Sequence, residues 1–171
     1  MVAHFRCLLI SCVVSILATG GNAAEWKKHR YTADRFEVEF SGAISVSETK
    51  INEETKKAVV RATDYQQDGG EFVYIVAASL TKTGVNFEKG SDASFAALKC
   101  KSKTKDVPLT VAGGRGRELA GTDCHDGNYR AETRYFTKDK WFYQALTLFK
   151  KEGGDVESAR YFLQSFKILG N

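Results

Sequence analysis

The spacing of apolar residues predicts a strand-rich first half of the chain. Phe36, Val38 and Phe40 alternate with two glutamates, which is typical of a strand with one buried face. Further strands are expected at 44–46 and 58–65, and the sequence at 68–70, Asp-Gly-Gly, favours a turn. Residues 72–78 are apolar at odd and even positions alike, which predicts a central strand covered on both faces.

Two helices are expected in the second half. The first runs from Ser91 or Asp92 to Lys101, because Ser91 is a suitable N-cap residue and small and apolar residues follow it. The second follows the cap residue Asp155 and has apolar residues at the spacing of one helix face. These helices are expected to cover the faces of the sheet that contains the central strand at 72–78.

Four more strands complete the pattern. They are expected at 109–112, 117–120, 129–136 and 141–148, and the last two form a hairpin through a turn at 137–140. Strands that follow one another, with helices between and after them, indicate an α+β fold: a mainly antiparallel sheet with helices packed on it. No repeat or linker interrupts the chain, so one domain over residues 25–171 is expected.

Residues 1–24 have the order of a cleaved secretory signal peptide. A basic start at Arg6 precedes an apolar run and then small residues, so cleavage is expected after Ala23 or Ala24. The apolar run is too short for a usual membrane span, so the mature chain is expected to have no transmembrane segment. In the alternative interpretation, residues 9–12 form a lipoprotein box and Cys12 is lipidated. Either way, a periplasmic or secreted protein is predicted.

The overall charge argues against nucleic acid as a partner. The formal net charge is +4 at pH 7, and it becomes +3 without residues 1–24, in which Arg6 is the only formal charge. Nucleic-acid binding usually needs a concentrated basic face.

Lysines recur at every second position near the end of the first expected helix, where the helix dipole and solvation favour them. A weak attraction to anionic surfaces is the alternative. These lysines are Lys99, Lys101, Lys103 and Lys105.

Two cysteines remain after removal of the leader, and they predict a disulfide. Cys100 and Cys124 would close a loop of about 25 residues, for which loop entropy gives roughly 3 to 4 kcal/mol. Neighbours in an extended segment point to opposite sides, so Cys124 and His125 do not form a catalytic dyad by adjacency. No catalytic residue is therefore expected. The alternative is a small thiol- or histidine-dependent hydrolase that pairs Cys124 with His29 or His125.

Metal and phosphate sites are not expected either. Asp123, His125 and Asp126 offer possible ligands, but their spacing matches no metal motif and suits a tight turn near Gly127. The glycine-rich residues 111–117 lead into an expected strand, whereas a phosphate-binding loop leads into a helix N-terminus. They therefore predict a hairpin or bulge, and no metal or cofactor is predicted.

Arginines and aromatic residues of the expected hairpin give the binding-site hypothesis. Arg130 and Arg134 share one face of their strand, and Arg117 lies on the strand before it. Three arginines around a shallow groove suit the recognition of carboxylates or of a partner surface. The alternative is a sheet face whose charges pair through Glu118 and Glu132. The predicted binding residues are Arg117, Arg130, Arg134, Tyr129, Tyr135, Trp141 and Tyr143.

The order of these features resembles bacterial members of the PsbP-like family over nearly the whole mature chain. The resemblance rests on Trp26 and Tyr31, on the strand FEVEF at 36–40, on the Gly-Arg-Glu turn at 116–118, on the hairpin at 129–148 and on the closing ARYFLQSF at 159–166. The sequence Phe-Ser-Gly at 40–42 lacks the proline that is common in that family. The resemblance implies an α-β-α sandwich, and it implies no reaction and no functional residues.

Together these observations predict an exported, non-enzymatic binding or accessory domain. The expected partner is an envelope protein or a small anionic ligand. A structural subunit of an envelope assembly is the third alternative.

Overall fold

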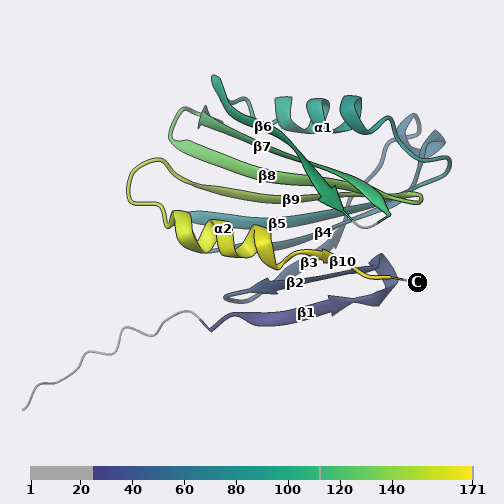
Figure 1. Ribbon diagram of the computed structural model, residues 1–171, viewed down its shortest axis with the longest axis horizontal. Coiled ribbons are helices and arrows are strands. Elements are labelled where there is room, and N and C mark those ends of the chain that lie inside the picture. Colours follow the sequence, from purple (N-terminus) through teal and green to yellow (C-terminus); the bar gives the residue numbers. More distant parts are fainter. Residues whose placement is uncertain (1–24, 112, 171) are drawn as a thin grey trace, which may run out of the picture.

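The computed structural model describes residues 25–111 and 113–170. The predicted signal peptide and the alternative lipidation of Cys12 fall on residues 1–24, outside the described residues. Figure 1 shows a large curved sheet with the order β3-β4-β5-β9-β8-β7-β6 and a small one with the order β1-β2-β10. Every strand pair in both sheets is antiparallel.

The large sheet contains seven strands, and the small sheet contains three. The large sheet is built from β3 (Ser45–Glu48), β4 (Val59–Asp68), β5 (Phe72–Thr81), β6 (Ser102–Val111), β7 (Gly114–Cys124), β8 (Tyr129–Lys138) and β9 (Trp141–Lys150). The small sheet is built from β1 (Lys27–Tyr31), β2 (Phe36–Phe40) and β10 (Lys167–Ile168). The helices are α1 (Phe87–Ala96) and α2 (Val156–Ser165), with short 3-10 turns η1 (Thr32–Asp34) and η2 (Thr55–Lys57).

The expected α+β fold, an α-β-α sandwich with helices packed on a sheet, is wrong. The fold is sheet-dominated, with 53% of the described residues in strands and 18% in helices and 3-10 turns. The error arose because no strand was predicted for residues 102–108, which form most of the strand β6. In addition, residues 27–31 and 167–168 pair with β2 and build a second sheet. The relation to the PsbP-like family itself stays a prediction.

The main core lies between the two sheets, on the face of the large sheet that also carries α2 (Figure 1). The apolar positions of β2, namely Phe36, Val38 and Phe40, are fully buried there. Tyr74 of β5 stacks on Phe162 of α2, with ring centroids 4.8 Å apart. The alternation predicted for residues 36–40 is therefore confirmed, and it marks the face of β2 that meets the large sheet.

The opposite face of the large sheet is less completely covered. β5 lies between β4 and β9, as expected of a central strand, but Val73 and Ile75 on this face are only half-buried. Here α1 packs against β7 and β8, with Phe87 of the helix near Leu119 and Tyr135 of the sheet. The prediction that β5 is buried on both faces is therefore correct for one face only.

A buried aspartate joins the small sheet to the large one. Asp34, in η1, accepts a hydrogen bond from the Tyr65 hydroxyl at 2.5 Å and forms an ion pair with Arg61. Its backbone carbonyl accepts a hydrogen bond from the Tyr143 hydroxyl at 3.0 Å. Burial, together with the hydrogen bond to Asp34, raises the pKa of Tyr65 well above its usual range. The phenol therefore stays a donor at every physiological pH.

The helix α1 begins four residues before the position that the sequence predicted. Its N-cap is Asn86, whose side chain accepts a hydrogen bond from the backbone N–H of Lys89 at 3.0 Å. It ends early because Cys100 must reach Cys124, and because the Leu98 carbonyl accepts a hydrogen bond from the His125 N–H at 2.9 Å. The predicted cap residue Ser91 instead lies buried inside the helix.

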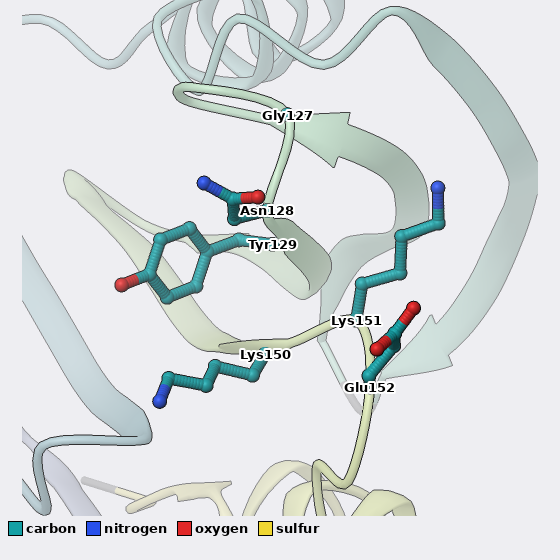
Figure 2. Close-up of a pocket in the computed structure, with 6 residues that line it drawn as sticks. All are labelled: Gly127, Asn128, Tyr129, Lys150, Lys151 and Glu152. Atoms are coloured by element: carbon teal, nitrogen blue, oxygen red, sulfur yellow. The ribbon is translucent and has the colours of Figure 1, made fainter.

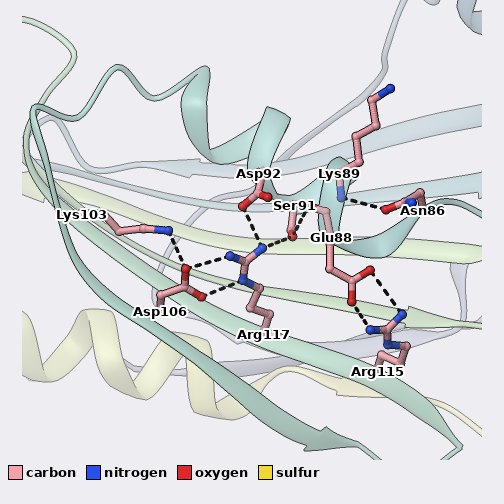
Figure 3. A network of polar contacts seen from close by, with 9 residues as sticks. All are labelled: Asn86, Glu88, Lys89, Ser91, Asp92, Lys103, Asp106, Arg115 and Arg117. Carbon is pink, nitrogen blue, oxygen red and sulfur yellow. Dashed lines mark hydrogen bonds and ion pairs between the residues drawn. The ribbon is translucent and has the colours of Figure 1, made fainter.

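Charged side chains fasten α1 to the sheet. Figure 3 shows Arg117 of β7 reaching Asp92 and the Ser91 hydroxyl of α1 on one side and Asp106 of β6 on the other. Arg115 makes a second ion pair with Glu88 of the same helix. Hydrogen bonds from Arg117 and Lys103 hold the pKa of Asp106 well below its usual range.

Candidate functional site

The register of β7 against β8 separates the three predicted arginines. Arg117 pairs with Tyr135, while Glu118 pairs with Arg134. Because successive side chains alternate between the faces of a sheet, Arg117 lies on the α1 face and Arg134 on the α2 face. Arg130 shares the face of Arg134 and lies over the Phe149 ring, 5.9 Å from its centroid. The structure therefore does not form the predicted groove of three arginines.

Most of the predicted aromatic residues belong to the core. Tyr135 and Tyr143 are fully buried, on opposite faces, and Trp141 is nearly so. The Tyr135 hydroxyl accepts a hydrogen bond from the Gln144 amide at 3.1 Å. Tyr129 is half-buried beside the disulfide. These residues hold the sheet together. Of the predicted set, only Arg130 and Arg134 retain partly exposed side chains on the α2 face, and Tyr129 lies half-buried on the opposite face.

The sequence Cys124-His125-Asp126 forms the corner between β7 and β8, as predicted. Cys124 is bonded to Cys100 in a disulfide, so it is not a free thiol. A Cβ atom on Gly121 would lie only 2.8 Å from the Cys100 Cβ, which explains a glycine beside this bond. The Asp126 carboxylate accepts a hydrogen bond from the Asn128 N–H at 3.1 Å, as in an ordinary tight turn. His29 lies away on β1, in the other sheet.

A hollow of about 470 Å³ adjoins this corner (Figure 2). It is lined by residues 127–129 and 150–152. Its two lysines, Lys150 and Lys151, extend in different directions and form ion pairs with Glu71 and Asp123. Because both cations already have acidic partners, this hollow offers little free charge to a ligand.

A larger hollow, of about 590 Å³, opens on the α2 face between β6, β8 and the segment that follows α2. Apolar side chains contributed by these three segments line it: Leu109, Val111, Phe136, Phe166 and Ile168. The rings of Phe136 and Phe166 are stacked 5.0 Å apart and are nearly buried, so they form its floor. Volumes of 300 to 1,000 Å³ are typical of sites for small molecules. We call this hollow the apolar half of the α2 groove.

Three cations surround the apolar half: Arg134, Lys138 and Lys167. Arg134 donates to the Glu118 carboxylate at 2.9 Å and to the Leu163 carbonyl at 3.2 Å. In the described part of the chain, neither Lys138 nor Lys167 forms an ion pair with an acidic side chain. Lys138 therefore lies beside an apolar floor without an acidic partner. Lys167 lies opposite Glu37 on the neighbouring strand β2, so it has an acid nearby.

A second hollow of about 400 Å³ continues past Arg134, which lines both. We call it the polar half of the α2 groove. Its lining includes Lys105, Arg160, Glu118 and Glu132, from β6, α2, β7 and β8. The Glu118 side chain is only 9% exposed and is paired with both Lys105 and Arg134. Burial alone would raise the pKa of Glu118, but the hydrogen bonds from these two cations outweigh it and lower the pKa.

Sequence reasoning identified Arg134 but missed the rest of the groove. The sequence predicts a turn at Lys138, a strand at Leu109 and a helix at Phe166, and it gives no prediction for Lys167. The groove is assembled from β6, β8 and the C-terminal segment, which are far apart in the sequence. No spacing pattern in a single sequence could bring them together.

Comparison with known proteins adds no family. The chain matches no protein-family model and no curated protein. In the described residues, no helix is long and apolar enough to cross a membrane.

Proposed function

We propose that this protein is a binding protein for a small amphipathic anion, which it holds in the α2 groove. The observation that carries the proposal is Lys138, without an acidic partner among the described residues, beside the apolar floor of Phe136 and Phe166, with Lys167 also lining the hollow. An apolar chain buried on that floor gains about 25 cal/mol for each Å² removed from water. An anionic head group here would supply the counter-charge that Lys138 lacks, and Lys167 would attract it as well.

We further propose that the protein works after export and without catalysis. The disulfide supports an oxidising compartment, because such bonds persist in secreted and periplasmic proteins. It also occupies Cys124, the nucleophile of the alternative hydrolase. Removal of residues 1–24 belongs to the same proposal, and an intact mass measured on protein from the envelope fraction would test it.

Calorimetric titration with decanoate tests the binding function. We expect decanoate to bind, whereas decyltrimethylammonium, which has the same chain and the opposite charge, and acetate, which lacks the chain, do not. The double variant Lys138→Gln with Lys167→Gln should bind decanoate about tenfold more weakly, because two exposed ion pairs together contribute about 1.4 kcal/mol.

The matched control is the double variant Lys82→Gln with Lys89→Gln. It removes the same charge from two exposed positions away from the groove. Lys82 lies in the segment between β5 and α1, and Lys89 lies in α1. It should bind decanoate like the wild type. Equal binding of decanoate and decyltrimethylammonium, or an unchanged affinity in the Lys138 and Lys167 variant, would show that the groove is not an anion site.

A further inference from the structure

The α2 groove is elongated, and its lining changes in a regular order along β8. Alternate residues of this strand face the groove in the order Glu132, Arg134, Phe136 and Lys138. At about 3.3 Å for each residue, the distance from the first to the last is roughly 20 Å. The apolar floor therefore lies between two polar ends.

Both ends carry a net positive charge. The lysine end has Lys138, which forms no ion pair among the described residues, and Lys167, which lies opposite Glu37 of β2. The polar end has three cations and two acids among its lining residues. These are Lys105, Arg134 and Arg160 with Glu118 and Glu132.

The polar end keeps one cation available. Lys105 and Arg134 share the single carboxylate of Glu118. Arg160 is exposed on α2, and no ion pair joins it to Glu132 or to another acid of the described chain. The guanidinium group presents a planar fork of donors that suits a carboxylate or phosphate. Glu132 opposes an anion here, but the three cations of this end still outnumber its two acids.

A ligand with one head group would leave one of these ends without a counter-charge. We propose that the ligand of the α2 groove is an apolar chain with an anionic group at each end, of which one lies at Lys138 and Lys167 and the other at Arg160 and Lys105. This inference rests on the proposed function and adds the second anion and the length. Arg134, at the junction of the two halves, lines the path of the chain.

The test compares tetradecanedioate with its monomethyl ester, which has the same chain and only one carboxylate. Calorimetric titration of the wild-type protein should show that the diacid binds about fivefold more tightly, which is about 1 kcal/mol for one additional exposed ion pair. In the variant Arg160→Gln, this preference for the diacid should disappear. Hexanedioate, which is too short to reach both ends, should bind weakly to both proteins.

The control variant is Arg30→Gln, which removes an exposed arginine from β1 in the small sheet. It should keep the preference for the diacid. If the wild type binds diacid and monoester equally, or if Arg160→Gln keeps the preference, the second anionic site is wrong. The monoester separates the two proposals: if it still binds and depends on Lys138 and Lys167, the proposed function stands, and if neither compound binds, both fail.

Discussion

At the scale of single residues, the most informative group is the Glu118 carboxylate. It is almost fully buried and lies between Lys105 of the edge strand and Arg134 of β8. From the sequence alone, Glu118 is only a possible charge partner in a sheet face. That interpretation was correct for Arg134, and the second partner, Lys105, depends on how β6 pairs with β7.

The lowered pKa of Glu118 predicts a loss of stability in acid. A carboxyl group whose pKa is lowered by folding contributes stability above its unfolded pKa, about 4.5, and loses it as the pH falls through the lower folded value. The free energy of unfolding, measured with urea between pH 7 and pH 2, should therefore fall below about pH 4.5. In Glu118→Gln this acid dependence should be shallower, and stability at pH 7 should be lower by about 1 to 2 kcal/mol.

Glu53→Gln is the control for this measurement, because Glu53 forms an exposed ion pair with Lys56. Its curve against pH should run parallel to that of the wild type. A parallel curve for Glu118→Gln as well would mean that Glu118 makes no special contribution to acid stability.

At the scale of elements, the strands were easier to predict than the helix α1. The alternating residues of β2 and the hairpin β8–β9 were recognisable because one face of each strand is buried. The start of α1 was predicted four residues late, because Ser91 and Asp92 have the composition of a cap and serve instead as partners of Arg117. Serine and aspartate are common both as helix N-caps and as partners of arginine, so a single sequence does not show which role they have.

The attachment of α1 predicts different results for its two arginines. The Arg117 side chain is 18% exposed and contacts both α1 and β6, whereas the Arg115 side chain is 62% exposed and contacts Glu88. Arg117→Ala should destabilise the protein by about 1 to 3 kcal/mol, and Arg115→Ala by less than about 1 kcal/mol. Urea unfolding measures both values.

Hydrogen exchange identifies where the effect arises. In Arg117→Ala, the amides of α1 should exchange faster than in the wild type, while those of β5 keep their protection. Uniformly faster exchange, or equal losses of stability in the two variants, would contradict a specific role of Arg117 in fastening α1.

At the scale of the whole molecule, the architecture does not follow from local sequence patterns. Residues 27–31 and 167–168 lie at opposite ends of the chain, yet both pair with β2. Pairing of such distant segments depends on tertiary contacts that no local pattern reports. The same limit applies to the α2 groove, whose walls come from β6 and from the C-terminal segment.

The joining of the two sheets predicts a strong effect of one hydroxyl group. Tyr65→Phe removes the hydrogen bond to the buried Asp34 carboxylate and should lower the free energy of unfolding by about 1.5 to 3 kcal/mol. The matched control is Tyr161→Phe, because Tyr161 is exposed and its hydroxyl donates to Glu39 at 2.6 Å in a hydrogen bond that is open to solvent. That variant should lose less than about 1 kcal/mol. Similar losses in both variants would show that Asp34 does not hold the sheets together.

The edge strand β6 also affects how these molecules behave toward one another. Most of its residues are exposed, and a long open edge invites a second chain to add to the sheet. Here the edge carries Pro108, which lacks an N–H, and the charged Lys103 and Lys105. These residues disfavour backbone pairing of β6 with an edge strand of a second molecule.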